Sequence, residues 1–119
     1  MPSFRIKQVN QVILEVLNQV FREECDFPDA ALVTILGVET SADLLYSKIV
    51  ISVFPLMKSK DVLDYLNRNI YNLQQALNKK LNMRPVPKMK FELNQTEEKA
   101  ARVEELLRQI KKTKSRKKK

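Results

Sequence analysis

Residues 37–44 read Gly37-Val38-Glu39-Thr40-Ser41-Ala42-Asp43-Leu44. This stretch is polar and prone to form turns, and it lies between two apolar runs. Residues 32–36 precede it and residues 45–54 follow it, and both runs are rich in the β-branched side chains that favour strands. This order predicts a β-hairpin with antiparallel strands over residues 32–40 and 44–54. The rest of the chain is expected to pack on this hairpin or to extend it.

The second strand has two unlike faces. Ser47, Ile49, Ile51 and Val53 fall on one face, and the alternate positions, such as Lys48, fall on the other. This pattern is typical of a sheet that helices cover on one side.

Three further segments have the periodicity of regular structure. Apolar residues recur at helical spacing over residues 4–23 and again over residues 59–82, where Ser59 can serve as the N-cap. Periodicity alone predicts one long helix over 59–82, although the asparagines at 67, 69 and 72 permit a break. Residues 88–93 alternate strictly and predict a third strand.

A last helix is predicted after residue 94, with an apolar side made of Ala100, Val103, Leu106, Leu107 and Ile110. The second and third strands are joined through helix, so a right-handed crossover would make them parallel. The chain is therefore expected to be an α+β domain with a three-stranded mixed sheet, helices packed on one face and a C-terminal helix.

Composition and charge divide the chain into a body and a tail. The 119 residues suit one domain, and no apolar run approaches the roughly 20 residues that span a bilayer. The net charge is +8, but residues 111–119 alone carry seven basic residues and no acid. We expect a folded domain over 1–110 and a disordered basic tail over 111–119. We therefore expect a cytoplasmic protein that does not bind a membrane.

One interval of the body is basic throughout. Between Tyr65 and Phe91 there is no acidic residue, and the basic residues are Arg68, Lys79, Lys80, Arg84, Lys88 and Lys90. Such a run is either a solvated face or an anion-binding surface. Arg5 and Lys7 have the same two interpretations. Tyr71 and Tyr46 are candidates for stacking or hydrogen bonding.

The sequence gives catalysis little support. It contains no histidine, no glycine-rich phosphate loop and no metal-ligand cluster, and Cys25 is its single cysteine. We therefore expect neither an enzyme nor a cofactor.

Two signatures resemble one known family. The predicted hairpin resembles that of bacterial ribosome-binding factor A at Gly37-Val38-Glu39, Ser41, Asp43-Leu44 and Ser47-Lys48-Ile49-Val50. The segment 83–91, with its basic residues, Val-Pro and alternating strand, resembles that family's second signature, and the resemblance covers roughly residues 4–110.

The resemblance implies a KH-like fold of the type with the helix first, and a bend between two helices. The family's Ala-x-Gly kink falls near Asn69-Ile70-Tyr71 in this chain, so a bend or break is expected within residues 68–72. The resemblance also implies an RNA-binding factor for small (30S) ribosomal subunits and their rRNA, which supports late 16S rRNA maturation without catalysis. We expect the factor to be a monomer and to bind free 30S subunits.

The expected RNA-binding residues are Arg5, Lys7, Arg68, Tyr71, Lys79, Lys80, Arg84, Lys88 and Lys90. The alternative function is a protein-interaction adaptor that uses the C-terminal helix, without specific RNA recognition.

Overall fold

The computed structural model describes residues 4–94, 99, 102–103 and 105–110. Its helices are α1 (Phe4–Glu24), α2 (Ser59–Arg68) and α3 (Ile70–Lys80), with 3-10 turns η1 (Pro28–Ala30) and η2 (Leu56–Lys58). Its strands are β1 (Leu32–Thr40), β2 (Tyr46–Phe54) and β3 (Lys88–Leu93). These bounds confirm the predicted strands and the N-terminal helix to within about two residues.

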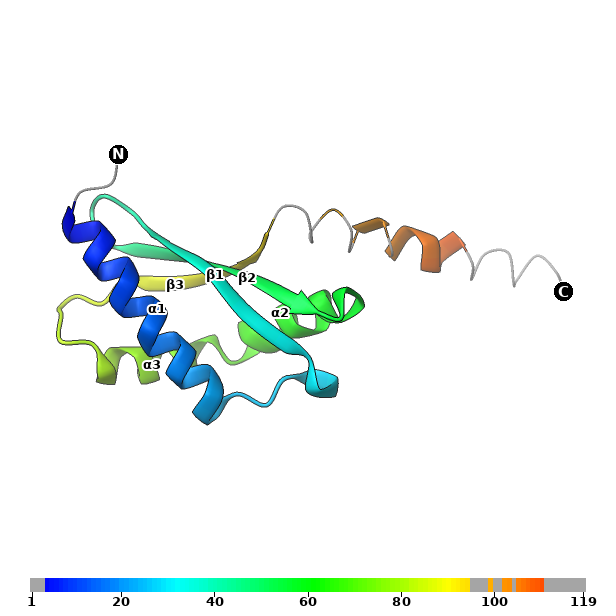
Figure 1. The fold of residues 1–119 in the computed structure, drawn as a ribbon, viewed down its shortest axis with the longest axis horizontal. Coiled ribbons are helices and arrows are strands. Elements are labelled where there is room, and N and C mark those ends of the chain that lie inside the picture. The colour runs from blue at the N-terminus through cyan, green and yellow to red at the C-terminus, as the bar shows by residue number, and fades with distance from the viewer. Residues whose placement is uncertain (1–3, 95–98, 100–101, 104, 111–119) are drawn as a thin grey trace, which may run out of the picture.

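The three strands form one sheet in the order β1-β2-β3 (Figure 1). β2 pairs antiparallel with β1 and parallel with β3, as the crossover through helix predicted. The register of β1 shifts between Ile35 and Gly37, so Leu36 is the extra residue of a β-bulge.

A network of hydrogen bonds fixes the turn between β1 and β2. The Asp43 carboxylate accepts from the Ser41 hydroxyl at 2.6 Å and from the Leu45 N–H at 3.0 Å. The bond from Ser41 contributes most, followed by that from Leu45, and together they hold the pKa of the Asp43 carboxyl below its ordinary value. Leu44 adopts a left-handed φ of 62°, which ends the turn, so β2 begins at Tyr46 rather than at residue 44.

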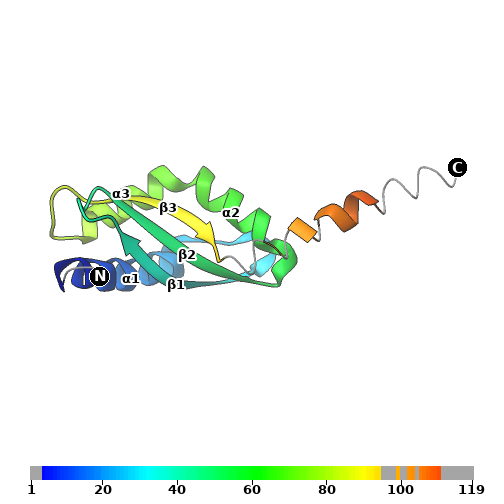
Figure 2. The same cartoon turned by 90° about the horizontal axis from the view of Figure 1, so that it is seen from above.

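The helices cover one face of the sheet. α1 packs on β1, α2 packs on β2 and β3, and α3 packs on β3 and on α1. α3 lies below the sheet in Figure 1. Ile49 and Ile51 of β2 are fully buried in a common cluster with Leu17 of α1 and with Leu66 and Leu77 of the second helical segment. Figure 2 looks onto the opposite face, here called the open face, which carries Tyr46, Lys48, Val50, Ser52 and Phe54 of β2.

The second helical segment is broken at Asn69, as the resemblance predicted and as periodicity alone did not. Asn69 has φ −102° and ψ 11°, and a new helix begins at Ile70. The prediction that Ser59 caps this segment was wrong. Lys58 occupies the N-cap position without a side-chain cap, and the Ser59 hydroxyl is buried with no hydrogen-bond partner among the described residues.

Residues 102–103 and 105–110 are helical, in agreement with the predicted last helix. Its apolar side chains Val103, Leu106, Leu107 and Ile110 are each more than half exposed. Ala100 and the basic tail over 111–119 lie outside the described residues. Among the helices that are described, none is long and apolar enough to cross a bilayer.

Candidate nucleic-acid interface

Most of the basic residues singled out from the sequence lie at one end of the domain. Five segments lie side by side in both views: the start of α1, the β1–β2 turn, the end of α3, the loop 81–87 and the start of β3 (Figures 1 and 2). These segments carry six cations, which we call the hairpin-end basic surface: Arg5, Lys7, Lys79, Lys80, Arg84 and Lys88. All six are exposed.

Polar side chains join α1 to the hairpin at this end. The Thr40 hydroxyl donates to the amide oxygen of Asn10 at 2.5 Å, and it lies 2.8 Å from the hydroxyl of Ser47. Ser47 is almost fully buried, so its hydroxyl needs this partner. Since Thr40 donates to Asn10, we assign Ser47 as the donor to Thr40.

A glutamine fixes the loop between α3 and β3. The Gln74 side chain donates to the carbonyl of Pro87 at 3.0 Å and accepts from the N–H of Met89 at 2.9 Å. Lys88 lies between these two residues, and its N–H donates to the carbonyl of Leu45 at 2.9 Å. Gln74 is not among the residues predicted from the sequence, because a polar residue within a helix gives no signal of a partner 13 to 15 residues away.

Five of these six cations form no ion pair with a described residue. Only Lys80 does, through a contact of 3.3 Å with Glu23 at the end of α1. A hydrogen bond from Gln19 and then the interaction with Lys80 lower the pKa of Glu23. Lys80 therefore helps to hold α1 against α3, while the others remain available to an external anion.

The middle of the open face is electrically compensated. Lys48 lies 2.8 Å from a carboxylate oxygen of Glu39 on β1 and 3.8 Å from one of Glu92 on β3. Hydrogen bonding to Glu39 raises the pKa of Lys48. Lys90 in turn pairs with Glu92 at 3.6 Å, so this predicted site residue has a partner within the sheet.

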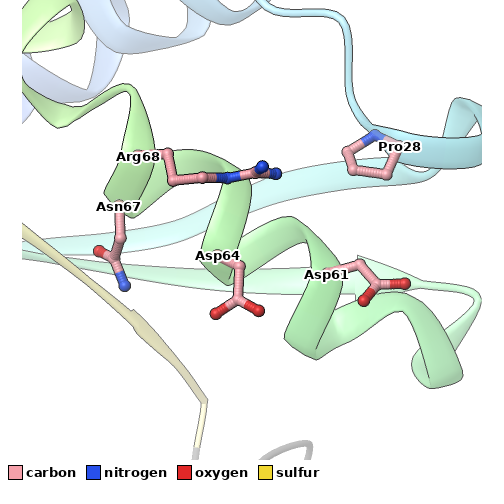
Figure 3. Close-up of a pocket in the computed structure, with 5 residues that line it drawn as sticks. All are labelled: Pro28, Asp61, Asp64, Asn67 and Arg68. Atoms are coloured by element: carbon pink, nitrogen blue, oxygen red, sulfur yellow. The ribbon is translucent and has the colours of Figure 1, made fainter.

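The structure places Arg68 and Tyr71 away from the hairpin-end basic surface. Arg68 projects from the end of α2 towards Pro28, above Asp64 and Asp61 of the same helix, at a hollow of about 600 Å³ (Figure 3). Tyr71 follows the break at Asn69 and is 71% exposed. The nine predicted residues therefore do not form one continuous patch.

Carboxylates and the single cysteine are the chain's candidates for metal binding or nucleophilic chemistry. No group of three or more histidine, cysteine, aspartate or glutamate side chains among them could hold a metal ion. Burial raises the pKa of Cys25 to about 11, so its thiol is protonated at neutral pH and a poor nucleophile.

Comparison with known proteins identifies the family. The sequence model of "Ribosome-binding factor A" matches residues 5–107, which is most of the chain. The chain belongs to the ribosome-binding factor A family. A member from Protochlamydia amoebophila is 32% identical over 108 residues, covering 89% of this chain and 82% of its own length. One from Chlorobium phaeobacteroides is 29% identical over 114 residues, covering 92% and 97%.

Solved structures of the family share the fold. The crystal structure of ribosome-binding factor A from Thermus thermophilus superposes with a TM-score of 0.67 at 20% identity, covering 74% of this chain and 93% of that one. A homology model of the Thermus thermophilus factor, fitted into a cryo-EM map of a 30S complex, superposes with a TM-score of 0.57 at 21% identity, covering 76% of this chain and 91% of that one. The predicted KH-like fold with its N-terminal helix is confirmed.

Proposed function

We propose that this chain is a ribosome assembly factor that binds free small subunits through their rRNA and supports late maturation of 16S rRNA. Family membership supports this proposal, as does the relative whose coordinates were fitted into a 30S complex. The observation that carries it is the hairpin-end basic surface, where five cations have no ion pair with a described residue.

The proposed mechanism is occupancy without catalysis. The hairpin-end basic surface contacts backbone phosphates and supplies affinity, while the shape of the domain selects the rRNA segment. The bound segment is held in an assembly-competent geometry and is released as the subunit matures. In this proposal the factor acts as a cytoplasmic monomer and needs no cofactor.

The C-terminal helix favours a second candidate function. Four apolar side chains of this helix, Val103, Leu106, Leu107 and Ile110, are exposed and could contact a protein partner. An adaptor of this kind would lose its partner when residues 96–119 are removed. An rRNA-binding factor would keep small-subunit binding in the same truncation, with the loss of the tail's charge contribution only.

Sedimentation through a sucrose gradient tests the first function. The protein, mixed with separated ribosomal particles, is expected in the fractions of free small subunits rather than with large subunits or complete ribosomes. Equal association with all three particles would contradict the proposal, because charge attraction alone does not choose between RNA-rich particles.

A further inference from the structure

The tyrosines of this chain differ in how the fold uses them. The Tyr65 hydroxyl accepts a hydrogen bond from the Asp26 N–H at 3.0 Å, and its ring packs edge-on against Phe27 with centroids 5.5 Å apart. Tyr46 and Tyr71 are instead 59% and 71% exposed. Single exposed aromatics are common on protein surfaces, so the surroundings of Tyr46 have to carry the argument.

Tyr46 is next to an uncompensated cation on the open face. It is the first residue of β2 and pairs in the parallel register with Lys88, the first residue of β3. Both residues are exposed in the alternating burial pattern of their strands, so both side chains lie on the open face. Neighbouring strands are about 4.8 Å apart, which places the ring and the lysine side chain together. Lys88 forms no ion pair with a described residue.

The hairpin turn holds the backbone of Tyr46. The Ser41 N–H donates to the Tyr46 carbonyl at 2.8 Å, and the Tyr46 N–H donates to the Ser41 hydroxyl oxygen at 3.1 Å. That hydroxyl is itself fixed by its bond to the Asp43 carboxylate. The ring therefore projects from a backbone that is ordered before any ligand binds, which lowers the entropic cost of binding.

The charges of the open face limit an anion to this end of the sheet. Further along β2, Lys48 is paired with Glu39 and Glu92, and Lys90 is paired with Glu92. At the far end, Leu32 and Phe54 pair with one another and are exposed apolar side chains. Among the described residues of this face, only the Tyr46 end combines an aromatic surface with an unpaired cation.

We propose that Tyr46 and Lys88 form a subsite for one unpaired RNA nucleotide, with the base stacked on the Tyr46 ring and a phosphate at the Lys88 ammonium. Sequence-tolerant recognition of unstacked bases combines these two elements. A base within a duplex has both faces covered, so the subsite selects single-stranded RNA. This inference rests on the proposed function, because it specifies the form of rRNA that the hairpin-end basic surface meets.

A tryptophan substituted for Tyr46 would report stacking directly. The natural chain contains no tryptophan, so Tyr46→Trp introduces a single indole fluorophore. Phe54→Trp is the matched control, because Phe54 is 70% exposed on the same open face at the other end of β2. The probe is a single-stranded oligouridylate of eight nucleotides, compared with a duplex RNA at equal phosphate concentration. We expect the oligouridylate to quench the indole fluorescence of the Tyr46→Trp variant strongly and the duplex to leave it nearly unchanged. The Phe54→Trp variant should show little quenching by either RNA, because its partner on the neighbouring strand is the apolar Leu32 and not a cation.

Affinity for the same probe gives a second readout. Tyr46→Ala is expected to weaken oligouridylate binding roughly 5- to 150-fold, the range for loss of one base–aromatic stack, while Tyr46→Phe retains the binding. Far-UV circular dichroism confirms that the variants are folded, and the fluorescence result stands even if Tyr46→Ala is not.

The subsite is overturned by any of three results: no quenching of the Tyr46→Trp variant by the single strand, equal quenching by the duplex, or unchanged affinity of folded Tyr46→Ala. Sedimentation of the wild-type protein with small subunits separates this failure from failure of the proposed function. Co-sedimentation without stacking at Tyr46 would remove the subsite alone.

Discussion

The side-chain amide of Asn69 donates a hydrogen bond at 2.8 Å to the carbonyl oxygen of Tyr65, which also accepts from the Asn69 backbone N–H at 3.1 Å. Asn69 thus closes the last turn of α2 with two donors at the residue where the helical conformation is interrupted. The helix then restarts, and the N–H of Leu73 donates to the Asn69 carbonyl at 3.0 Å. Asparagine suits this position because its side chain bonds locally to the backbone.

Replacing Asn69 with alanine tests whether this side-chain bond stabilises the break. We expect Asn69→Ala to lower the free energy of unfolding by roughly 0.5–1.5 kcal/mol, the usual net contribution of one hydrogen bond. Asn72→Ala is the control, because Asn72 is exposed within α3 and alanine is the better helix former. Urea denaturation with an unchanged m-value measures both. If Asn69→Ala stabilises the protein as much as Asn72→Ala, helix propensity outweighs the side-chain bond.

The alternation of β2 predicts unequal costs for two neighbouring residues. Ile51 is fully buried, and Ile51→Ala should cost roughly 2–5 kcal/mol in the free energy of unfolding because it leaves a cavity. Val50 lies on the open face and is only half-buried, so Val50→Ala should cost clearly less. Chemical denaturation of the two variants decides the matter, and equal losses would contradict the assignment of the covered face.

The Asp43 turn predicts a dependence of stability on pH. Its hydrogen bonds hold the carboxylate's pKa below the ordinary value of 3.8, so this contribution to stability is complete above that value. It is lost as the pH falls through the lower pKa of the folded state. Asp43→Asn cannot titrate, so its disadvantage relative to the wild type should shrink between about pH 5 and pH 2. Thermal melting over this range measures the effect, and parallel curves would contradict it.

The sequence predicted the sheet well because its signals are local. Alternation identified the buried positions Ile49 and Ile51, and the turn residues Ser41 and Asp43 indicated the hairpin. The parallel pairing of β3 followed from the intervening helical segment. These features depend on residues close in the chain and on general rules of chain connection.

The site was less accessible from the sequence because it depends on contacts between distant residues. The basic interval between Tyr65 and Phe91 gave no sign that Lys80 pairs with Glu23, 57 positions earlier in the chain. The partner of Lys90 is close in the chain, but Glu92 lies just outside that interval. The position of Arg68 away from the hairpin end required the three-dimensional arrangement of α2. Ser59 failed as a predicted cap because its side chain is buried by packing, which propensity does not register.

Deleting residues 111–119 tests the role of the basic tail predicted from the sequence. The truncated protein should bind RNA more weakly at low salt and show a flatter salt dependence, since each lost phosphate contact removes roughly 0.7–0.9 from the slope. Its preference for small subunits over unrelated RNA should survive, because we assign specificity to the folded domain. Filter binding at several salt concentrations measures both quantities. Loss of the preference by a folded truncation would instead make the tail the recognition element.

Paired neutralisation of charge tests the central claim most directly. The double variant Lys79→Gln with Lys88→Gln removes two cations of the hairpin-end basic surface. The control, Arg22→Gln with Lys60→Gln, removes one exposed cation from the last turn of α1 and one from the first turn of α2. Both double variants have the same net charge, and surface substitutions of this kind usually change stability by less than about 0.5 kcal/mol.

The measurement is the affinity of each double variant for free small subunits as a function of salt concentration. We predict that the Lys79 and Lys88 variant binds more weakly and that its salt slope falls by about 1.4 to 1.8, as expected for two lost phosphate contacts. The Arg22 and Lys60 variant should behave like the wild type. Equal losses of affinity and slope in both would contradict the claim, because they would show that net charge, and not the hairpin-end basic surface, binds the subunit.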